Sequence, residues 1–228
     1  MKQLVVLNSE AHRALRVRAG PAARSGDDKR FVAVVVSEFS HAVVHYPILL
    51  SKDADTGAFY CGVMLGFDEG ENLFLDEGRN VYRPLNLQRG PFYTAGTELA
   101  IDLDHPRVGA ADGQPLFAEN GAPTPYLASI IELMRELRPG LERTKIFVDT
   151  LATLKLIAPM AIDVAFDDGT KREVAGLYTI DQEALRALPD AAVLDLFRRG
   201  YLQLIYLMIA SLKQVSALAQ RKNRRLLA

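Results

Sequence analysis

The sequence has little of several features that would assign it to a special class of protein. One cysteine, Cys61, occurs among 228 residues, so no disulfide can form within the chain. The net charge is −1 and the pI is near 6.4, which gives no general attraction to nucleic acid. The longest apolar stretch, Tyr201 to Leu212, is 12 residues and includes Gln203, whereas a membrane-spanning helix needs about 20. We therefore expect a cytoplasmic chain with no nucleic-acid partner and no membrane span.

Sequence motifs for the common kinds of catalysis are also missing. The chain has no GxSxG nucleophile elbow and no glycine-rich phosphate loop of either common pattern. Its four histidines, at positions 12, 41, 45 and 105, do not form a known catalytic motif. Hydride transfer and nucleotide-driven chemistry are thus disfavoured and no cofactor is predicted. The sequence identifies no catalytic residue, and it favours a binding protein over an enzyme.

What the chain does have is the composition of an ordinary globular protein. Its residues are 49 % hydrophobic and 24 % charged, which excludes disorder and a pure coiled coil. The length suits one domain over residues 1–228, and no linker divides it. We predict an α+β fold in which residues 1–106 are mainly β and residues 124–228 are mainly helical, with a hairpin near 160–180.

The first half is predicted to consist of antiparallel strands joined by tight turns. Glycine and proline separate short apolar stretches between Gly57 and Leu103. Residues 76–80, Asp-Glu-Gly-Arg-Asn, are the best hairpin turn in this region. Phe31 to Val36 is a β-branched run typical of a buried strand, and Pro47 to Leu50 is its expected partner.

The second half is predicted to be helical. Thr124 and Pro125 make a helix start, and Pro139 with Gly140 is expected to end that helix. A separate helix is predicted over residues 142–158, and a long final helix of about thirty residues after Pro189. The apolar stripe of that last helix is broad, which favours a core position, with a contact between two copies of the chain as the alternative.

One loop region mixes arginine with aromatic side chains. Arg83, Arg89, Phe92 and Tyr93 lie close together in sequence around a stiff Gly-Pro bend. Arginine in such a setting can hold a carboxylate or phosphate while aromatic rings cover the apolar part of a ligand. The alternative is structural, with an arginine clamping a neighbouring loop such as the acidic one at 67–72. Together with Asn72, these four are the candidate ligand-binding residues.

Two other clusters are candidates for metal binding. Glu38, His41 and His45 are spaced to share one face of a short helix, and imidazole with carboxylate is a ligand set that metals accept. A second cluster of three carboxylates, Asp68, Glu69 and Glu71, is either a solvated turn or a site for a cation or an amine. The first cluster has no third histidine and no cysteine nearby in sequence, and polar residues on an exposed helix face are the alternative there.

Six short segments, found in a fixed order along the chain, carry a resemblance to a known family. They are Phe31–Phe39, His45–Ile48, Gly66–Phe74, Tyr82–Phe92, Gly176–Leu185 and Ser211–Gln214. On these segments the sequence resembles the SapC family over nearly its whole length. The sequence departs from many relatives at Asn80, where tryptophan is common, and at Gln88–Gly90, which replaces a more basic, aromatic run. The resemblance implies an accessory role in nutrient or glycan use.

The residues and the resemblance together leave two functional hypotheses. In the preferred one, the chain is an accessory protein that binds an unknown small molecule or protein partner through the loop region from Gly66 to Phe92. The rival is a metal-assisted enzyme that uses Glu38, His41 and His45, or the three carboxylates of the acidic loop. Self-association through the last helix is a further expectation.

Overall fold

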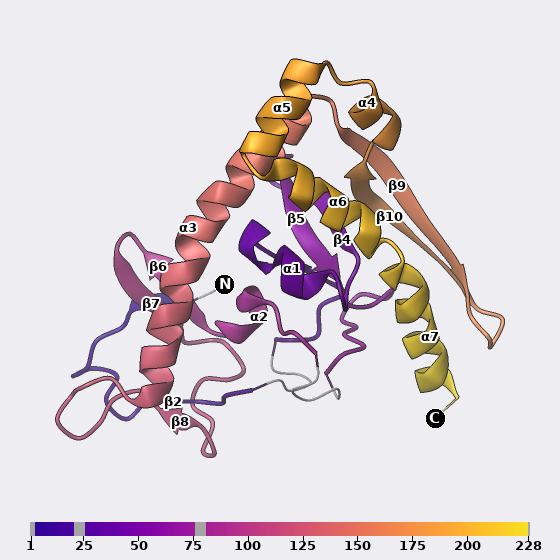
Figure 1. Ribbon diagram of the computed structural model, residues 1–228. Helices are drawn as coiled ribbons and strands as arrows, with labels where there is room; N and C mark the ends of the chain where they lie inside the picture. Colours follow the sequence, from indigo (N-terminus) through magenta and orange to yellow (C-terminus); the bar gives the residue numbers. More distant parts are fainter. Residues whose placement is uncertain (1–2, 21–25, 76–80, 228) are drawn as a thin grey trace. The chain divides into compact units, whose positions relative to one another are not determined.

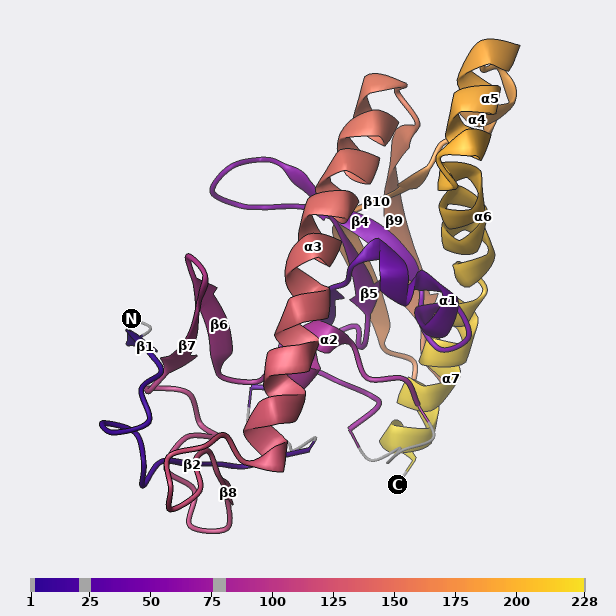
Figure 2. The same cartoon turned by 60° about the vertical axis from the view of Figure 1, so that its left-hand side comes forward.

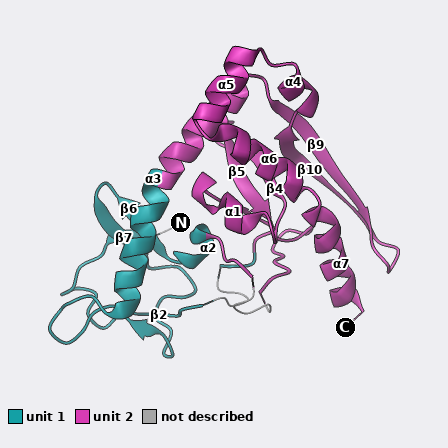
Figure 3. Ribbon diagram, in the orientation of Figure 1, with its two compact units in different colours: residues 1–28, 85–139 teal, residues 29–84, 140–228 magenta. Residues whose placement is uncertain are grey.

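The computed structural model describes residues 3–20, 26–75 and 81–227, and it divides the chain into two compact units. Unit 1 comprises residues 1–28 and 85–139, and unit 2 comprises residues 29–84 and 140–228 (Figure 3). The predicted turn at 76–80, including Asn80, lies outside the described residues. Antiparallel strands dominate the first half and helices the end of the chain, so the predicted α+β fold is confirmed (Figure 1).

Unit 1 is built on a three-stranded antiparallel sheet. Its strand order is β1 (Leu4–Val6), β7 (Glu98–Asp102), β6 (Phe92–Ala95), so β6 is an edge strand. The short helix α2 (Leu85–Gln88) precedes β6. The first part of the long helix α3 (Pro125–Thr153) lies next to β6 (Figure 2).

The remaining strands of unit 1 make a small second sheet, and a buried ion pair lies in this unit. Strand β2 (Arg16–Val17) pairs with β8 (Gln114–Pro115). The Arg107 guanidinium donates a hydrogen bond to the Asp27 carboxylate, and both side chains are almost fully buried, at 2 % and 3 % exposure. A charge removed from water in this way needs its partner, because burying it alone is costly.

Unit 2 is built on a five-stranded antiparallel sheet. Its order is β3 (Phe31–Ala33), β5 (Phe59–Met64), β4 (Ile48–Lys52), β10 (Lys171–Ile180), β9 (Ile157–Ala165). The predicted hairpin near 160–180 is confirmed as β9 and β10. The predicted pairing of the Phe31 strand with Pro47–Leu50 is wrong, because β5 lies between β3 and β4 and pairs with both.

Unit 2 has a short helical segment before β4 and further helices after β10. The segment consists of η1 (Val36–Glu38) and α1 (Phe39–Ala42). After the sheet come α4 (Gln182–Arg186), α5 (Asp190–Arg198), α6 (Tyr201–Ser211) and α7 (Gln214–Leu226). Helix α6 contacts β4 and β10, and the buried Ser211 hydroxyl accepts a hydrogen bond from the Ile48 amide at 2.8 Å.

The long final helix is present but bent. Gly200 adopts φ +73°, a left-handed conformation that favours glycine, and separates α5 from α6. By length and composition alone, the stretch Tyr201–Leu226 is apolar enough to cross a membrane; its most apolar window has a mean hydropathy of 1.4 and is 22 % buried. Core helices of globular proteins also have this length and composition.

Helix α3 contradicts the prediction that a helix ends at Pro139. It continues as one 29-residue helix to Thr153, although an internal proline costs about 3 kcal/mol. Beyond the proline, the helix buries Phe147 and Leu151 completely. The Thr144 hydroxyl also accepts a hydrogen bond from the Val36 amide at 2.9 Å. Packing in unit 2 therefore offsets the local cost, which the sequence signal alone could not show.

Candidate functional site

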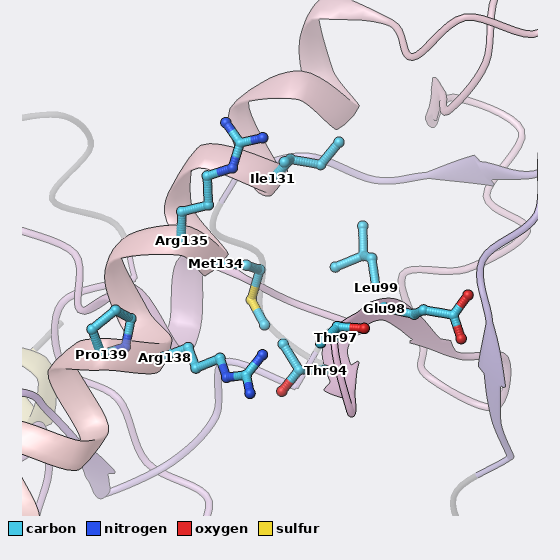
Figure 4. Close-up of a pocket in the computed structure, with 9 residues that line it drawn as sticks. All are labelled: Thr94, Thr97, Glu98, Leu99, Ile131, Met134, Arg135, Arg138 and Pro139. Atoms are coloured by element: carbon cyan, nitrogen blue, oxygen red, sulfur yellow. The ribbon is translucent and has the colours of Figure 1, made fainter.

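A groove of about 470 Å³ lies in unit 1 between the β6–β7 hairpin and helix α3; it is called the α3–β6 groove below. Nine residues line it: Thr94, Thr97, Glu98, Leu99, Ile131, Met134, Arg135, Arg138 and Pro139 (Figure 4). Leu99, Ile131 and Met134 make an apolar floor. Two arginines and one glutamate are the charged groups of its lining.

The hairpin wall of the groove has its shape because of a tight two-residue turn. Ala95 and Glu98 face each other as the last pair of the β6–β7 ladder, which leaves Gly96 and Thr97 as the loop. Gly96 has φ +62°, as the first loop position of a type II′ turn requires. The turn places the side chain of Thr94 toward α3 (Figure 4).

The helix wall follows from helical periodicity. Ile131, Met134, Arg135 and Arg138 are spaced at i, i+3, i+4 and i+7, which puts them on one face of α3. The same face therefore carries an apolar half and a cationic half. A ligand with an apolar body and an anionic group can contact both halves at once.

The charged groups of the groove differ in how they are engaged. Arg138 extends toward the hairpin and donates a hydrogen bond from Nη1 to the Gly96 carbonyl at 3.0 Å (Figure 4). Arg135 forms an exposed ion pair with Glu132 on its own helix. The carboxylate of Glu98 points away from α3 (Figure 4). Arg138 is therefore the cation best placed to meet an anion in the groove.

The predicted ligand-binding residues Arg89, Phe92 and Tyr93 come together in unit 1. The Arg89 guanidinium lies 4.0 Å from the centre of the Tyr93 ring and donates to the Phe92 carbonyl at 2.9 Å. It also donates to the Asn86 side chain at 3.0 Å. Phe92 is fully buried. Arg89 thus clamps the connection between α2 and β6, next to the α3–β6 groove, and its predicted role in ligand binding stays a prediction.

The other two predicted ligand-binding residues, Asn72 and Arg83, belong to unit 2. Asn72 is buried, and its side-chain oxygen accepts a hydrogen bond from the Phe74 amide at 2.9 Å. This is a local Asx turn that shapes the loop. Arg83 is half-buried in the stretch just before α2.

Glu38 is engaged in the structure of unit 2. The residue is 1 % exposed, and its carboxylate accepts hydrogen bonds from the Val35 amide at 2.8 Å and from the Tyr82 hydroxyl at 2.9 Å. His41 is exposed and stacks on the Tyr82 ring, with centroids 5.2 Å apart. Burial, and then the charge of Arg221, lower the pKa of His45. Among the described residues, no group of three His, Cys, Asp or Glu side chains is placed to hold a metal ion.

The acidic loop is bound to the last helix of unit 2. Lys222 on α7 lies 2.9 Å from Asp68 and also contacts Glu71. Arg172 of β10 contacts Asp68 from the other side at 2.6 Å, and Arg30 pairs with Glu69. The three carboxylates therefore hold arginine and lysine side chains of their own unit.

These contacts make the stability of unit 2 depend on pH. Hydrogen bonds from Lys222 and then Arg172 hold the pKa of Asp68 below its usual range. Burial lowers the pKa of Lys222, but its hydrogen bonds to Asp68 and Glu71 outweigh burial and raise it. A depressed carboxyl pKa adds stability above about pH 4 that is lost as the pH falls through the folded value. A raised lysine pKa adds stability below about pH 10 that is lost as the pH rises through the folded value.

Replacing Lys222 by methionine should lower the free energy of unfolding by about 1–2 kcal/mol at pH 7, because Glu71 would lose its partner in a site where both side chains are only 13 % exposed. The difference from the wild type should shrink as the pH falls through the lowered pKa of Asp68. Urea unfolding of the variant and the wild type at pH 7 and at pH 3 measures the loss of stability and its decrease at low pH. The matched control is Lys145→Met, which breaks an exposed pair with Asp149 and should change little. An equal loss at both pH values would contradict this account.

Sequence reasoning did not find the α3–β6 groove. Leu99, Ile131 and Met134 were recognisable as apolar positions, but those positions are usual in any core. The usable signal was the pair Arg135 and Arg138 on the same face as Ile131 and Met134. The predicted recognition region, Gly66 to Phe92, ends two residues before the first groove residue.

Comparison with known proteins gives one match. The family model described as SapC matches residues 7–218 of the 228-residue chain. No curated protein and no solved structure matches it. The matched range covers nearly the whole chain and includes every residue that lines the groove. The chain therefore belongs to the SapC family.

Proposed function

We propose that this chain is a binding protein, and that the α3–β6 groove captures a ligand with an apolar body and an anionic group. The observation that carries the proposal is the position of Arg138 beside an apolar floor made by Leu99, Ile131 and Met134. The groove volume, about 470 Å³, lies within the usual range for small-molecule sites. A guanidinium suits carboxylate, sulfonate and phosphate groups, because it can donate two parallel hydrogen bonds.

The state of the reactive side chains supports binding rather than catalysis. Cys61 is buried, and burial raises the pKa of its thiol to about 12, so it is a poor nucleophile at neutral pH. The Glu38 carboxylate accepts hydrogen bonds from the Val35 amide and from the Tyr82 hydroxyl. The rival hypothesis, a metal-assisted enzyme, gains no support from the surroundings of Glu38 or of the acidic loop.

The cellular setting is part of the same proposal. A cytoplasmic location, with an accessory role in nutrient or glycan use, is consistent with a protein that captures a small organic anion or the end of a partner protein. The proposal includes self-association of the chain, because Phe197 on α5 and Tyr206 on α6 are exposed aromatic residues that a second copy would cover.

The proposal predicts selective binding of anions with an apolar body. Calorimetric titration with 4-phenylbutyrate and with 4-phenylbutylamine compares two probes that share a body and differ in charge. The butyrate should bind and the amine should not. Arg138→Glu should weaken butyrate binding at least tenfold, because a charge-assisted hydrogen bond contributes about 1.5–3 kcal/mol.

The control for this experiment is Arg143→Glu, an exposed position on α3 that does not line the groove. It should bind the butyrate as the wild type does. Equal binding of the two probes by the wild type, or unchanged affinity in the Arg138→Glu protein, would remove the proposed function.

A further inference from the structure

We infer that the α3–β6 groove binds an extended peptide segment that pairs with Thr94 on the open edge of β6 and presents a carboxylate to Arg138. This inference deepens the proposed function and rests on it. Adding a strand to an exposed sheet edge is a common way of recognising peptides, in which main-chain hydrogen bonds give affinity and side-chain contacts give specificity.

The hydrogen-bond pattern of the sheet identifies the open edge. In an antiparallel pair, alternate residues exchange hydrogen bonds with the partner strand and the residues between them point their amides outward. The Asp102 amide bonds to the Pro91 carbonyl, so Tyr93 and Ala95 are the next β6 residues that bond to β7. The N–H and C=O of Thr94 therefore face away from β7.

Arginine side chains cover the edge on both sides of Thr94. At Phe92, the amide bonds to the Arg89 carbonyl and the carbonyl accepts from the Arg89 guanidinium. At Gly96, the carbonyl accepts from Arg138. Within the described part of the chain, neither the N–H nor the C=O of Thr94 has a hydrogen-bond partner. One peptide residue can thus form both main-chain hydrogen bonds with Thr94. The guanidinium groups of Arg89 and Arg138 lie on either side of that position.

The surroundings of Thr94 define the chemistry of the peptide. Side chains alternate between the two faces of a strand and directly paired residues share a face, so the peptide residue paired with Thr94 points its side chain into the groove. An apolar side chain there would cover Leu99, Ile131 and Met134. A carboxylate two residues further along, on the same face of the peptide, would meet Arg138, which can release Gly96 or bind both. The carboxylate belongs either to an aspartate or glutamate side chain or to the end of a chain.

The test uses a synthetic pool of random hexapeptides, made once with a free C-terminal carboxylate and once with a C-terminal amide. Affinity selection on the full chain followed by mass spectrometry identifies the bound peptides, and fluorescence anisotropy gives their Kd values. Bound sequences should combine an apolar residue with a carboxylate. Selection from the free-acid pool alone would identify a chain terminus as the ligand, and selection of acidic sequences from both pools would identify an internal segment.

The discriminating variant is Thr94→Pro. It removes the outward N–H but no ladder hydrogen bond, and proline is tolerated on edge strands. Peptide affinity should fall at least tenfold, and Thr94→Val, which keeps the N–H and loses only the hydroxyl, should lose less affinity than Thr94→Pro. If Thr94→Pro does not fold, N-methylation of each peptide amide in turn removes the other main-chain hydrogen bond, from the peptide N–H to the Thr94 carbonyl, and one methyl group should cause the tenfold loss.

Failure of this inference is separable from failure of the proposed function. Unchanged peptide affinity in Thr94→Pro and with every N-methylated peptide, or no peptide selected from either pool, would overturn strand addition. If 4-phenylbutyrate still binds through Arg138 in that case, the groove remains an anion site of another kind. If the wild type binds neither the peptides nor the butyrate, both proposals fail.

Discussion

Replacing Asp27 by alanine is expected to lower the free energy of unfolding by about 3–5 kcal/mol, the largest effect that we predict for a single substitution in this chain. Asp27 and Arg107 are buried together in unit 1, so the variant would leave the Arg107 guanidinium without its carboxylate partner and away from water. A shift of this size is a large part of the stability of a typical domain. Urea unfolding followed by circular dichroism measures it.

The control is Asp112→Ala, which breaks the exposed ion pair with Arg18 and should leave the unfolding midpoint almost unchanged. A double variant, Asp27→Leu with Arg107→Met, should recover much of the loss, because replacing both members of a buried pair by apolar groups removes the unpaired charge. If Asp27→Ala were as stable as Asp112→Ala, the pair would not have the structural role that its burial indicates.

Replacing Glu38 by alanine is expected to cost about 2–4 kcal/mol, because the Val35 amide and the Tyr82 hydroxyl would each lose an acceptor. The same variant decides between the structural and the metal-binding interpretation of this residue. Zn²⁺ binding, measured by calorimetry on untagged protein, should be as weak in the folded Glu38→Ala protein as in the wild type.

Glu38→Gln is the matched variant, since its amide oxygen can still accept one of the two hydrogen bonds, and it should be the more stable of the two. His41→Ala, at an exposed position that stacks on Tyr82, should lower stability much less. Tight Zn²⁺ binding by the wild type that disappears in both Glu38→Gln and His41→Ala would instead establish a metal site and restore the enzyme hypothesis.

The α+β class was predictable from the sequence because it depends on local patterns. The turn residues between Gly57 and Leu103 and the hairpin of β9 and β10 are signals contained within a few neighbouring residues. The left-handed glycine at position 200, by contrast, was not read as a break in the last helix. A single glycine inside a helical pattern is tolerated often enough that sequence alone gives no decision.

The candidate site was predictable only in part. Arginine beside aromatic residues led to a ligand-binding prediction and to the structural alternative of an arginine that clamps a loop, and in the structure Arg89 stacks on Tyr93. The loop that Arg89 clamps is its own, not the acidic loop, which holds Arg30, Arg172 and Lys222 instead. Which cation meets which carbonyl or carboxylate depends on distances between segments far apart in the chain.

By itself the sequence determined the α+β class, the hairpin of β9 and β10, the family to which the chain belongs, and the charges available on each segment. Only the tertiary structure decided that α3 continues through Pro139, that β5 lies between β3 and β4, and that Arg138 reaches the β6–β7 hairpin. The physical reason is the same in each case. Local preferences amount to a few kcal/mol, and the burial of side chains such as Phe147 against distant segments is large enough to override them.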